Sequence, residues 1–220
     1  MTRRAILFDL DGTLIDSLSF HRESFREVFR RSGKKPPLAP LADLIRWNKT
    51  QIYERFGVQK KLKMGRHSFW ARRNRILASM VTRRMEIPDR WALVKRLAKK
   101  YPLGLTTNSS AAIVRMETTP QFTRYFSAIV SGSDVRRAKP YPDMLLAAAK
   151  KLAVPPRECL MIGDAAVDGL AARAAGMKAI LFSGKSSASP LCELKKSRPQ
   201  AIVRNASQLQ KELEKLGFFA

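Results

Sequence analysis

Short apolar runs alternate with amphipathic stretches along most of the chain, and several of these runs end in polar residues. Six of them are expected to form strands: residues 3–8, 102–107, 126–132, 159–164, 178–182 and 201–203. Between them, apolar positions recur three and four residues apart and predict helices over residues 89–100, 141–152, 168–177 and 207–217, with another beginning near residue 110. This alternation predicts an α/β fold with a doubly wound parallel sheet and helices on both faces.

Residues 18–85 interrupt the alternation after the first strand. The pattern is helical over residues 17–31, 41–57 and 66–85, shows no strand, and includes a Gly- and Pro-rich loop, GKKPPLAP. The segment is too long for a loop of a compact domain. We therefore expect a core domain formed by residues 1–17 and 86–220, with residues 18–85 inserted as an all-helical domain.

Two further features of the core pattern are interpreted in the same way. Asp89 precedes an amphipathic run and is expected to cap the N-terminus of that helix. Residues 183–199 are basic and rich in serine, and we expect them to form a long loop.

Charge changes the picture more than composition does. The chain of 220 residues carries 42 Lys and Arg against 18 Asp and Glu, a formal net charge of +24. Residues 18–87 hold 18 of the basic residues and 5 of the acidic ones. This charge favours anionic partners such as phosphorylated metabolites, nucleic acid or acidic surfaces. A solvated surface in an organism whose proteins are generally basic explains the charge equally well.

Composition bounds the class of protein and its location. Hydrophobic residues make up 45% of the chain, which predicts a globular protein. No apolar run reaches the ~20 residues needed to span a bilayer, so we expect no membrane partner. Two cysteines give no disulfide framework. Asp9 ends the first apolar run too early for a signal peptide, and we expect a cytoplasmic protein.

Polar clusters follow three of the predicted strands, and a lysine precedes a helix between them. In chain order the candidate residues are Asp9 and Asp11 after the first strand, Thr107 and Asn108 after the second, Lys139 before the helix, and Asp164 with Asp168 after the fourth strand. In an open parallel sheet, ligands bind outside the carboxyl ends of the strands. We therefore expect these clusters to converge at one edge.

Such a cluster has a definite chemistry. Converging carboxylates repel one another, and a hard divalent cation such as Mg²⁺ relieves that repulsion through oxygen ligands. Thr107 and Asn108 suit hydrogen bonds to phosphate oxygens, Lys139 adds a positive charge, and a carboxylate suits nucleophilic attack on phosphorus. Taken singly, each residue is also typical of a helix cap, a turn or a solvated surface. The order of the four clusters carries the interpretation.

Four stretches, DLDGTLIDS, LTTN, AKPYPD and MIGDAAVDGLAARAAGM, resemble in order the signature motifs of the haloacid dehalogenase superfamily. The resemblance covers most of the chain. It implies a Rossmann-like core, with the insert as the helical cap of the superfamily's first cap class, similar to phosphoglycolate phosphatases and β-phosphoglucomutases.

The resemblance implies roles for the acidic residues. Asp9 matches the nucleophile, with its other oxygen on Mg²⁺. Asp11 matches the general acid and base, whose main-chain carbonyl also binds the metal. Asp164 matches the metal-binding acid of the fourth motif, and Asp168 its partner, as a ligand or as a residue behind the ligands.

The resemblance implies substrate contacts as well. Thr107 and Asn108 match the phosphate-binding motif, and Lys139 matches the lysine that steadies the nucleophile and the phosphoryl group. His21 stands where sugar phosphomutases and many related phosphatases have a histidine. Arg46 lies where relatives often have small residues of a substrate loop. It is expected to hold a second anionic group of the substrate, and a solvated helix start explains it equally well.

Several activities stay open at this point. Asp11 favours phosphate chemistry, because dehalogenases lack that second aspartate. Phosphonate hydrolysis needs a cap lysine, and no motif singles one out. A β-phosphoglucomutase-like sugar phosphomutase is an alternative. Trp70 lies close to arginines that also suit nucleic-acid phosphates, so a phosphatase or binding protein for nucleotides or nucleic acid is another. The residues favour a Mg²⁺-dependent phosphatase acting on a small phosphorylated metabolite.

Overall fold

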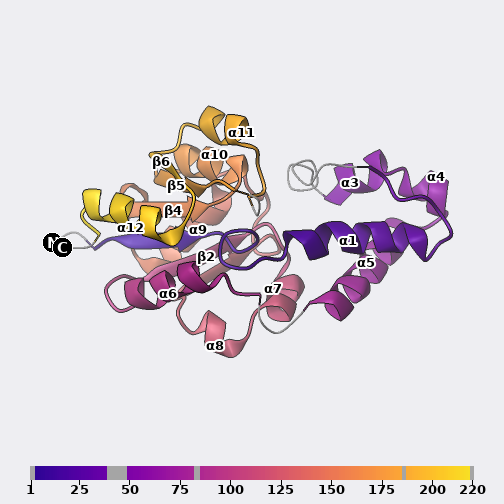
Figure 1. Ribbon diagram of the computed structural model, residues 1–220, viewed down its shortest axis with the longest axis horizontal. Helices are drawn as coiled ribbons and strands as arrows, with labels where there is room; N and C mark the ends of the chain where they lie inside the picture. Colours follow the sequence, from indigo (N-terminus) through magenta and orange to yellow (C-terminus); the bar gives the residue numbers. More distant parts are fainter. Residues whose placement is uncertain (1–2, 39–48, 82–84, 185–186, 219–220) are drawn as a thin grey trace. The chain divides into compact units, whose positions relative to one another are not determined.

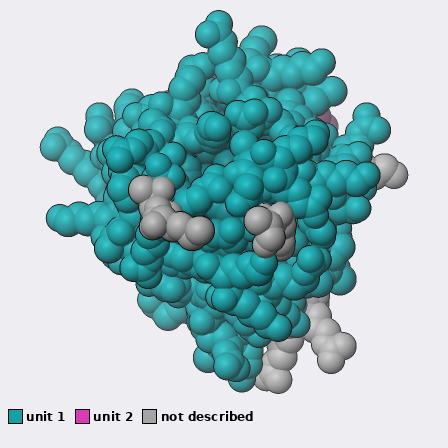
Figure 2. Space-filling view, turned by 90° about the vertical axis from the view of Figure 1, so that its left-hand side faces the viewer, with its two compact units in different colours: residues 1–16, 86–220 teal, residues 17–85 magenta. Residues whose placement is uncertain are grey.

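The computed structural model describes residues 3–38, 49–81, 85–184 and 187–218. Its chain contacts divide into two compact units, residues 1–16 with 86–220 (unit 1) and residues 17–85 (unit 2), coloured separately in Figure 2.

Six parallel strands form the sheet of unit 1, in the order β3-β2-β1-β4-β5-β6 (Figure 1). Their bounds are β1 (Ala5–Phe8), β2 (Leu103–Thr107), β3 (Ala128–Ser131), β4 (Cys159–Gly163), β5 (Lys178–Phe182) and β6 (Ala201–Val203). Ile6 of β1 pairs with Leu103 on one side and Leu160 on the other. The first strand in the chain is therefore a central strand, which explains why all four of its residues are apolar and buried.

Seven α-helices are described in unit 1. They are α6 (Pro88–Leu97), α7 (Ala111–Glu117), α8 (Pro120–Thr123), α9 (Asp143–Leu152), α10 (Ala166–Ala174), α11 (Leu191–Lys196) and α12 (Ala206–Lys215). Helices α9 and α10 share one buried core with the central strands, and α12 packs against α6. The connections β3-α9-β4 and β4-α10-β5 run across the sheet in one direction, and the connection from β1 through α6 to β2 runs in the other. Right-handed crossovers therefore place α9 and α10 on one face and α6, with α12 against it, on the opposite face. The predicted doubly wound parallel sheet is confirmed.

Unit 2 is helical throughout its described residues. It contains α1 (Leu18–Arg30), α3 (Lys49–Arg55), α4 (Val58–Leu62) and α5 (Arg66–Met80). Aromatic side chains form its core, with Phe25 stacked on Phe69 at 6.2 Å between ring centroids and edge-on to Phe56 at 5.7 Å. These rings bury more apolar area than aliphatic side chains would, and so give a small unit an adequate core.

Three details of the sequence interpretation are wrong. The loop expected over residues 183–199 contains helix α11, which buries Leu194 and has Glu193 near its start and two lysines at its end, as a helix dipole favours. Asp89 is not a cap, because Pro88 occupies the first helical position and places Asp89 inside α6. Its carboxylate accepts instead from the amide of Ala206, at 3.1 Å.

Helix α5 also ends earlier than residue 85. It stops at Met80 because Val81 is extended, with ψ of 121°. Among the helices of the described residues, none combines the length and the hydropathy that crossing a bilayer requires.

Candidate active site

The predicted residues of unit 1 lie at the carboxyl ends of three neighbouring strands. Asp9 follows β1 directly, Thr107 is the last residue of β2, and Asp164 follows β4. The amide of Asp9 still donates to the carbonyl of Ile162 in β4, at 2.8 Å. The first aspartate is therefore held by strand pairing rather than by a loop, which fixes its position relative to β4.

Lys139 joins two of the acids across unit 1. Its ammonium lies 2.6 Å from Oδ1 of Asp9 and 2.6 Å from Oδ1 of Asp168, and donates to the carbonyl of Thr106 at 3.0 Å. The Lys139 side chain is 1% exposed, so the ion pairs are shielded from water. The neighbouring acids raise the pKa of Lys139 more than burial lowers it, and the side chain stays charged.

Asp9, Asp164 and Asp168 form a buried cluster of carboxylates. One oxygen of each lies within 4.8 Å of the others. Burial raises the pKa of Asp9 to about 7, although the Lys139 ammonium lowers it. Burial and the charge of Asp9 raise the pKa of Asp164 as well. Three carboxylates carry more negative charge than the single ammonium of Lys139 balances, and carboxylate oxygens are hard donors. Such a set of ligands fits Mg²⁺.

Main-chain and hydroxyl donors orient two acids of this cluster. Asp164 accepts from Oγ1 of Thr13 at 3.0 Å and from the amide of Ala188 at 2.6 Å. Asp168 accepts from the amide of Ala165 at 3.0 Å through Oδ2, which leaves Oδ1 for Lys139. Each carboxylate is thus fixed in orientation before any ligand binds.

A second pair of contacts places Asp11. Its Oδ2 accepts from Oγ of Ser109 at 2.9 Å and from Oγ1 of Thr107 at 3.3 Å. The Ser109 amide in turn donates to Oγ1 of Thr107, at 3.0 Å. Asp11 is only partly buried, unlike Asp9. The two aspartates therefore have different surroundings, as a nucleophile and an acid–base group need.

The side chain of Asn108 holds the segment that carries Lys139. Its Nδ2 donates to the carbonyl of Lys139 at 3.0 Å, and its Oδ1 accepts from the Lys139 amide at 3.0 Å. The sequence placed Asn108 on phosphate. The structure brings Asn108 to the site, where its side-chain amide bonds the main chain of Lys139, and its contact with phosphate stays a prediction.

The two predicted substrate contacts of the insert belong to unit 2 or lie outside the described residues. His21 is in α1, where its Nδ1 lies 2.5 Å from a guanidinium nitrogen of Arg73. Arg73 is buried in α5 and lies over the ring of Phe25, 4.6 Å from its centroid. Arg46 falls outside the described residues.

Sequence reasoning missed four residues that donate hydrogen bonds to the acids, namely Thr13, Ser109, Ala165 and Ala188. Thr13 and Ser109 stand next to predicted motif residues, so the stretches DGT and TNS contained a usable signal. Ala188 acts through its main-chain amide and lies far along the chain from Asp164. A main-chain donor leaves no trace in side-chain pattern, and only the fold reveals it.

Comparisons with known proteins identify a family and several relatives. A family model described as haloacid dehalogenase-like hydrolase matches residues 6–182. Fructose-1-phosphate phosphatase YqaB of Escherichia coli is 28% identical over 176 residues, covering 80% of this chain and 94% of its own length. Phosphoglycolate phosphatase of Shigella dysenteriae is 26% identical over 212 residues, covering 80% of each protein.

Solved structures share the fold. The crystal structure of β-phosphoglucomutase from Clostridium difficile matches with a TM-score of 0.76 at 21% identity, over 99% of this chain and 97% of that one. At that identity the likeness concerns the fold alone, with its sheet and its helical insert.

Proposed function

Because the chain belongs to the haloacid dehalogenase-like hydrolase family, we propose that it is a Mg²⁺-dependent phosphatase that hydrolyses a small anionic phosphomonoester through an aspartyl phosphate on Asp9. Family membership confirms the resemblance that its four motifs suggested. Phosphatases among its relatives, one acting on fructose 1-phosphate and one on phosphoglycolate, support the reaction class.

One observation carries the proposal. The buried carboxylate of Asp9 lies beside the Lys139 ammonium and within the Asp164–Asp168 cluster, while Asp11 stands two residues away in a more exposed, hydroxyl-bonded position. A nucleophile needs a charged form held in place, and a proton donor needs access to a leaving group. The buried, ion-paired environment of Asp9 suits a nucleophile, and the more exposed environment of Asp11 suits a proton donor.

In the proposed first step, a carboxylate oxygen of Asp9 attacks phosphorus. The bond from phosphorus to the ester oxygen breaks, and protonated Asp11 donates its proton to that oxygen as the alcohol leaves. The ammonium of Lys139 keeps Asp9 oriented and balances charge on the phosphoryl oxygens. Asn108 fixes the main chain of Lys139 and so fixes the ammonium.

In the proposed second step, Asp11 is ionised and accepts a proton from water. The water oxygen attacks phosphorus, the acyl phosphate bond breaks, and inorganic phosphate leaves Asp9 as a carboxylate. Thr107 and Ser109 hold Asp11 in position through both steps by donating hydrogen bonds to its Oδ2.

Asp9, Asp164 and Asp168 are the residues that would hold Mg²⁺, with Asp11 contributing as the resemblance implies. When bound, the cation supplies positive charge for the phosphoryl oxygens and removes the repulsion among the carboxylates. Burial and the charges of the neighbouring acids raise the pKa of Asp9 and of Asp164, and a bound cation would counter both effects.

The substrate class follows from charge and from the relatives. A net charge of +24 favours an anionic substrate, and sugar phosphates and phosphoglycolate both fit. We assign His21 and Arg46 to the leaving group on the strength of the motif resemblance. Arg46 then favours substrates with a second anionic group.

Phosphate release from a panel of substrates tests the proposal. The panel holds phosphoglycolate, fructose 1-phosphate, other hexose phosphates, nucleoside monophosphates and an end-phosphorylated oligonucleotide, each with Mg²⁺ and with EDTA. We expect Mg²⁺-dependent release with a preference for one small phosphomonoester. Trapping of ³²P on the protein, lost in Asp9→Asn, tests the covalent step.

The outcomes separate the alternatives. Release from the oligonucleotide above all others favours a nucleic-acid phosphatase. Interconversion of sugar phosphates in the presence of a sugar bisphosphate, with little free phosphate, favours a mutase. Release that persists in purified Asp9→Asn contradicts the assignment of the nucleophile.

A further inference from the structure

The guanidinium of Arg90 lies buried in unit 1, beside the turn that follows β1. Arg90 is in the first turn of α6, is 9% exposed, and has its Cζ 3.8 Å from the ring centroid of Phe182. Burial lowers the pKa of this guanidinium, and the carboxylates of Asp164 and Asp89 raise it. Arginine remains protonated in proteins. The proposed reaction makes no use of this buried cation.

The Arg90 guanidinium donates hydrogen bonds to main-chain carbonyl groups of the turn formed by residues 10–15. The amides of residues 13–15 all donate to the carbonyl of Leu10, at 3.3, 2.9 and 3.1 Å. The carbonyls of Gly12 and Thr13 accept instead from Nη1 of Arg90, at 2.7 and 2.9 Å. Both residues are buried, so without Arg90 these carbonyls would lose a charged donor.

The same turn reaches two groups of the site. Thr13 uses its carbonyl for Arg90 and its hydroxyl for Oδ1 of Asp164, at 3.0 Å. Gly12, which has a φ of 79°, directly follows Asp11. A shift of this turn would therefore move the hydroxyl that orients Asp164 and the main chain next to Asp11 together.

Main-chain contacts tie the start of α6 to this turn as well. The amide of Ile87 donates to the carbonyl of Leu14 at 2.9 Å, and Glu86 forms an antiparallel bridge with Ile15. Arg90 lies one helical turn beyond Ile87. Residues 86–90 therefore contact the turn at Leu14 and Ile15 through main-chain groups, and at Thr13 and Gly12 through the Arg90 side chain.

We propose that Arg90 is a positioning residue for Asp164, one of the carboxylates that would hold Mg²⁺. It holds the Gly12–Thr13 turn in the one conformation that lets Thr13 orient Asp164. This inference rests on the proposed function, because it concerns the same site. Arg90 is then a second buried cation that supports the site. Lys139 pairs with carboxylates, whereas Arg90 bonds main-chain carbonyl groups.

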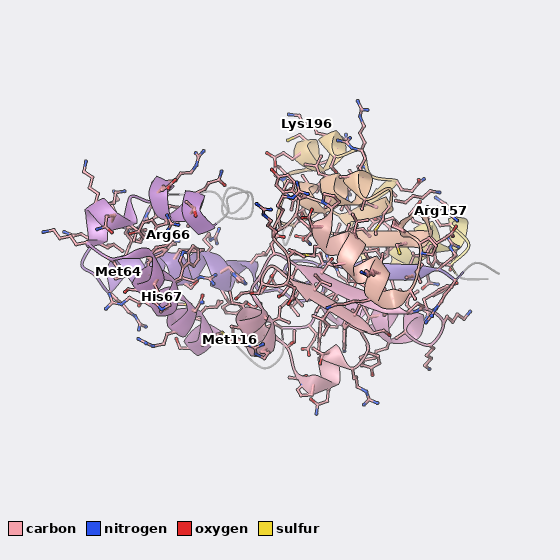
Figure 3. The ribbon with its side chains drawn as sticks, turned by 180° about the vertical axis from the view of Figure 1, so that it is seen from behind. Met64, Arg66, His67, Met116, Arg157 and Lys196 are labelled. Atoms are coloured by element: carbon pink, nitrogen blue, oxygen red, sulfur yellow. The ribbon has the colours of Figure 1, made fainter. Side chains whose placement is uncertain are left out.

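Substitutions at position 90 test the proposal against a matched control. Arg90→Met keeps bulk and removes the charge and donors, and Arg90→Lys keeps the charge on a shorter side chain. The control changes are Arg157→Met and Arg157→Lys. Arg157 is exposed, precedes β4 and so lies at the amino edge of the sheet (Figure 3). Each variant is measured for kcat, KM, Mg²⁺ dependence and the rise in Tm that Mg²⁺ produces.

We expect Arg90→Met to lower kcat or the affinity for Mg²⁺ by roughly 10- to 100-fold, the usual effect of losing a residue behind a metal ligand. KM should change by less than about threefold, because no substrate contact is removed. The Mg²⁺-induced rise in Tm should shrink. Arg90→Lys should recover part of both losses, and the Arg157 variants should match the parent.

A double-mutant cycle with Thr13→Val separates positioning from general stability. If Arg90 acts through Thr13, adding Arg90→Met to Thr13→Val should cost much less Mg²⁺ affinity than it costs in the parent. Additive losses overturn the proposal, as do Arg90 variants that lose Tm while keeping the parent kcat and Mg²⁺ response. If Arg90→Met fails to fold, Arg90→Lys carries the same comparison.

The parent chain separates this inference from the function on which it rests. A parent without Mg²⁺-dependent phosphate release and without a Mg²⁺-induced rise in Tm overturns the proposed function. An active parent with parent-like Arg90 variants overturns only the role of Arg90.

Discussion

At the scale of single residues, one ammonium serves two carboxylates. Lys139 lies at equal distances, 2.6 Å, from Asp9 and Asp168, while Asp164 is left to hydroxyl and amide donors. Three acids around one buried cation leave the site with excess negative charge. Proton uptake or a divalent cation removes that excess, and the two compete.

This competition predicts how stability depends on pH in EDTA. Burial raises the pKa of Asp9 from the usual 3.8 of an aspartate to about 7 in the folded chain, so between these values the folded state binds more protons than the unfolded state. Stability therefore falls as pH rises from 5 to 7. The slope contributed by Asp9 is on the order of 1 kcal/mol per pH unit.

Urea unfolding of the parent and of Asp9→Asn, at pH values from 5 to 8, measures that slope. Asp9→Asn removes the titrating group, so the parent should lose stability relative to the variant as pH rises, and Mg²⁺ should flatten the difference. Parallel pH profiles for the two proteins would show that Asp9 titrates normally.

A second residue-scale prediction concerns Asn108. Because its amide fixes both main-chain groups of Lys139, Asn108→Ala should misplace the ammonium and lower kcat by roughly 10- to 100-fold. Asn108→Asp retains the oxygen that accepts from the Lys139 amide and should lose less. A rise in KM alone, with kcat unchanged, would point to direct phosphate binding instead.

At the scale of elements, Gly163 at the end of β4 allows the side chain of Asp168 to lie directly against the strand. A Cβ added to Gly163 would lie 2.3 Å from Oδ2 of Asp168, the oxygen that accepts from Ala165. Glycine at this position lets α10 bring Asp168 against the strand end. The cluster of Asp9, Asp164 and Asp168 therefore depends on the missing side chain at Gly163 as well as on the side chains present.

Gly163→Ala should consequently displace Asp168. We expect a loss of about 1–3 kcal/mol in the free energy of unfolding and at least a tenfold loss of kcat. Gly65→Ala is the matched control, since an added Cβ there meets nothing within 4 Å and φ is −68°. Its stability should stay within about 0.5 kcal/mol of the parent.

The sequence predicts an element or a contact well when it depends on neighbouring residues, and poorly when it depends on residues far apart along the chain. Strand β1 was predictable because its four apolar residues end abruptly at Asp9. Helix α11 was not, because Leu194 is its one fully buried side chain and gives no periodicity. Arg90 could not be identified, because its partners lie 77 and 78 residues away and are carbonyl groups.

At the scale of the whole molecule, charge is the dominant property. A net charge of +24 produces a positive field that raises the encounter rate with anions and is screened by salt. Exposed basic side chains, such as Arg66 in unit 2 and Lys196 in unit 1, occur in both units (Figure 3). Both units therefore contribute to the field.

We accordingly expect kcat/KM to fall several-fold between about 0.05 and 0.5 M salt. The fall should be steeper for phosphoglycolate than for an aryl phosphate, since its carboxylate adds a negative charge. Initial rates in two salts with different anions, at matched ionic strength, check this. Equal slopes for both substrates would argue against steering by charge.

The central place of β1 has a consequence for synthesis of the protein. β1 leaves the ribosome before both of its neighbours, β2 and β4, which end at Thr107 and Gly163. At ~5–20 residues per second, the nascent strand waits for many seconds before both partners exist. Until β2 is synthesised, the apolar segment that ends at Asp9 has no strand to pair with, and until β4 is synthesised it has only one. A polypeptide released before residue 168 would lack the assembled site altogether, however well its helical segment had folded.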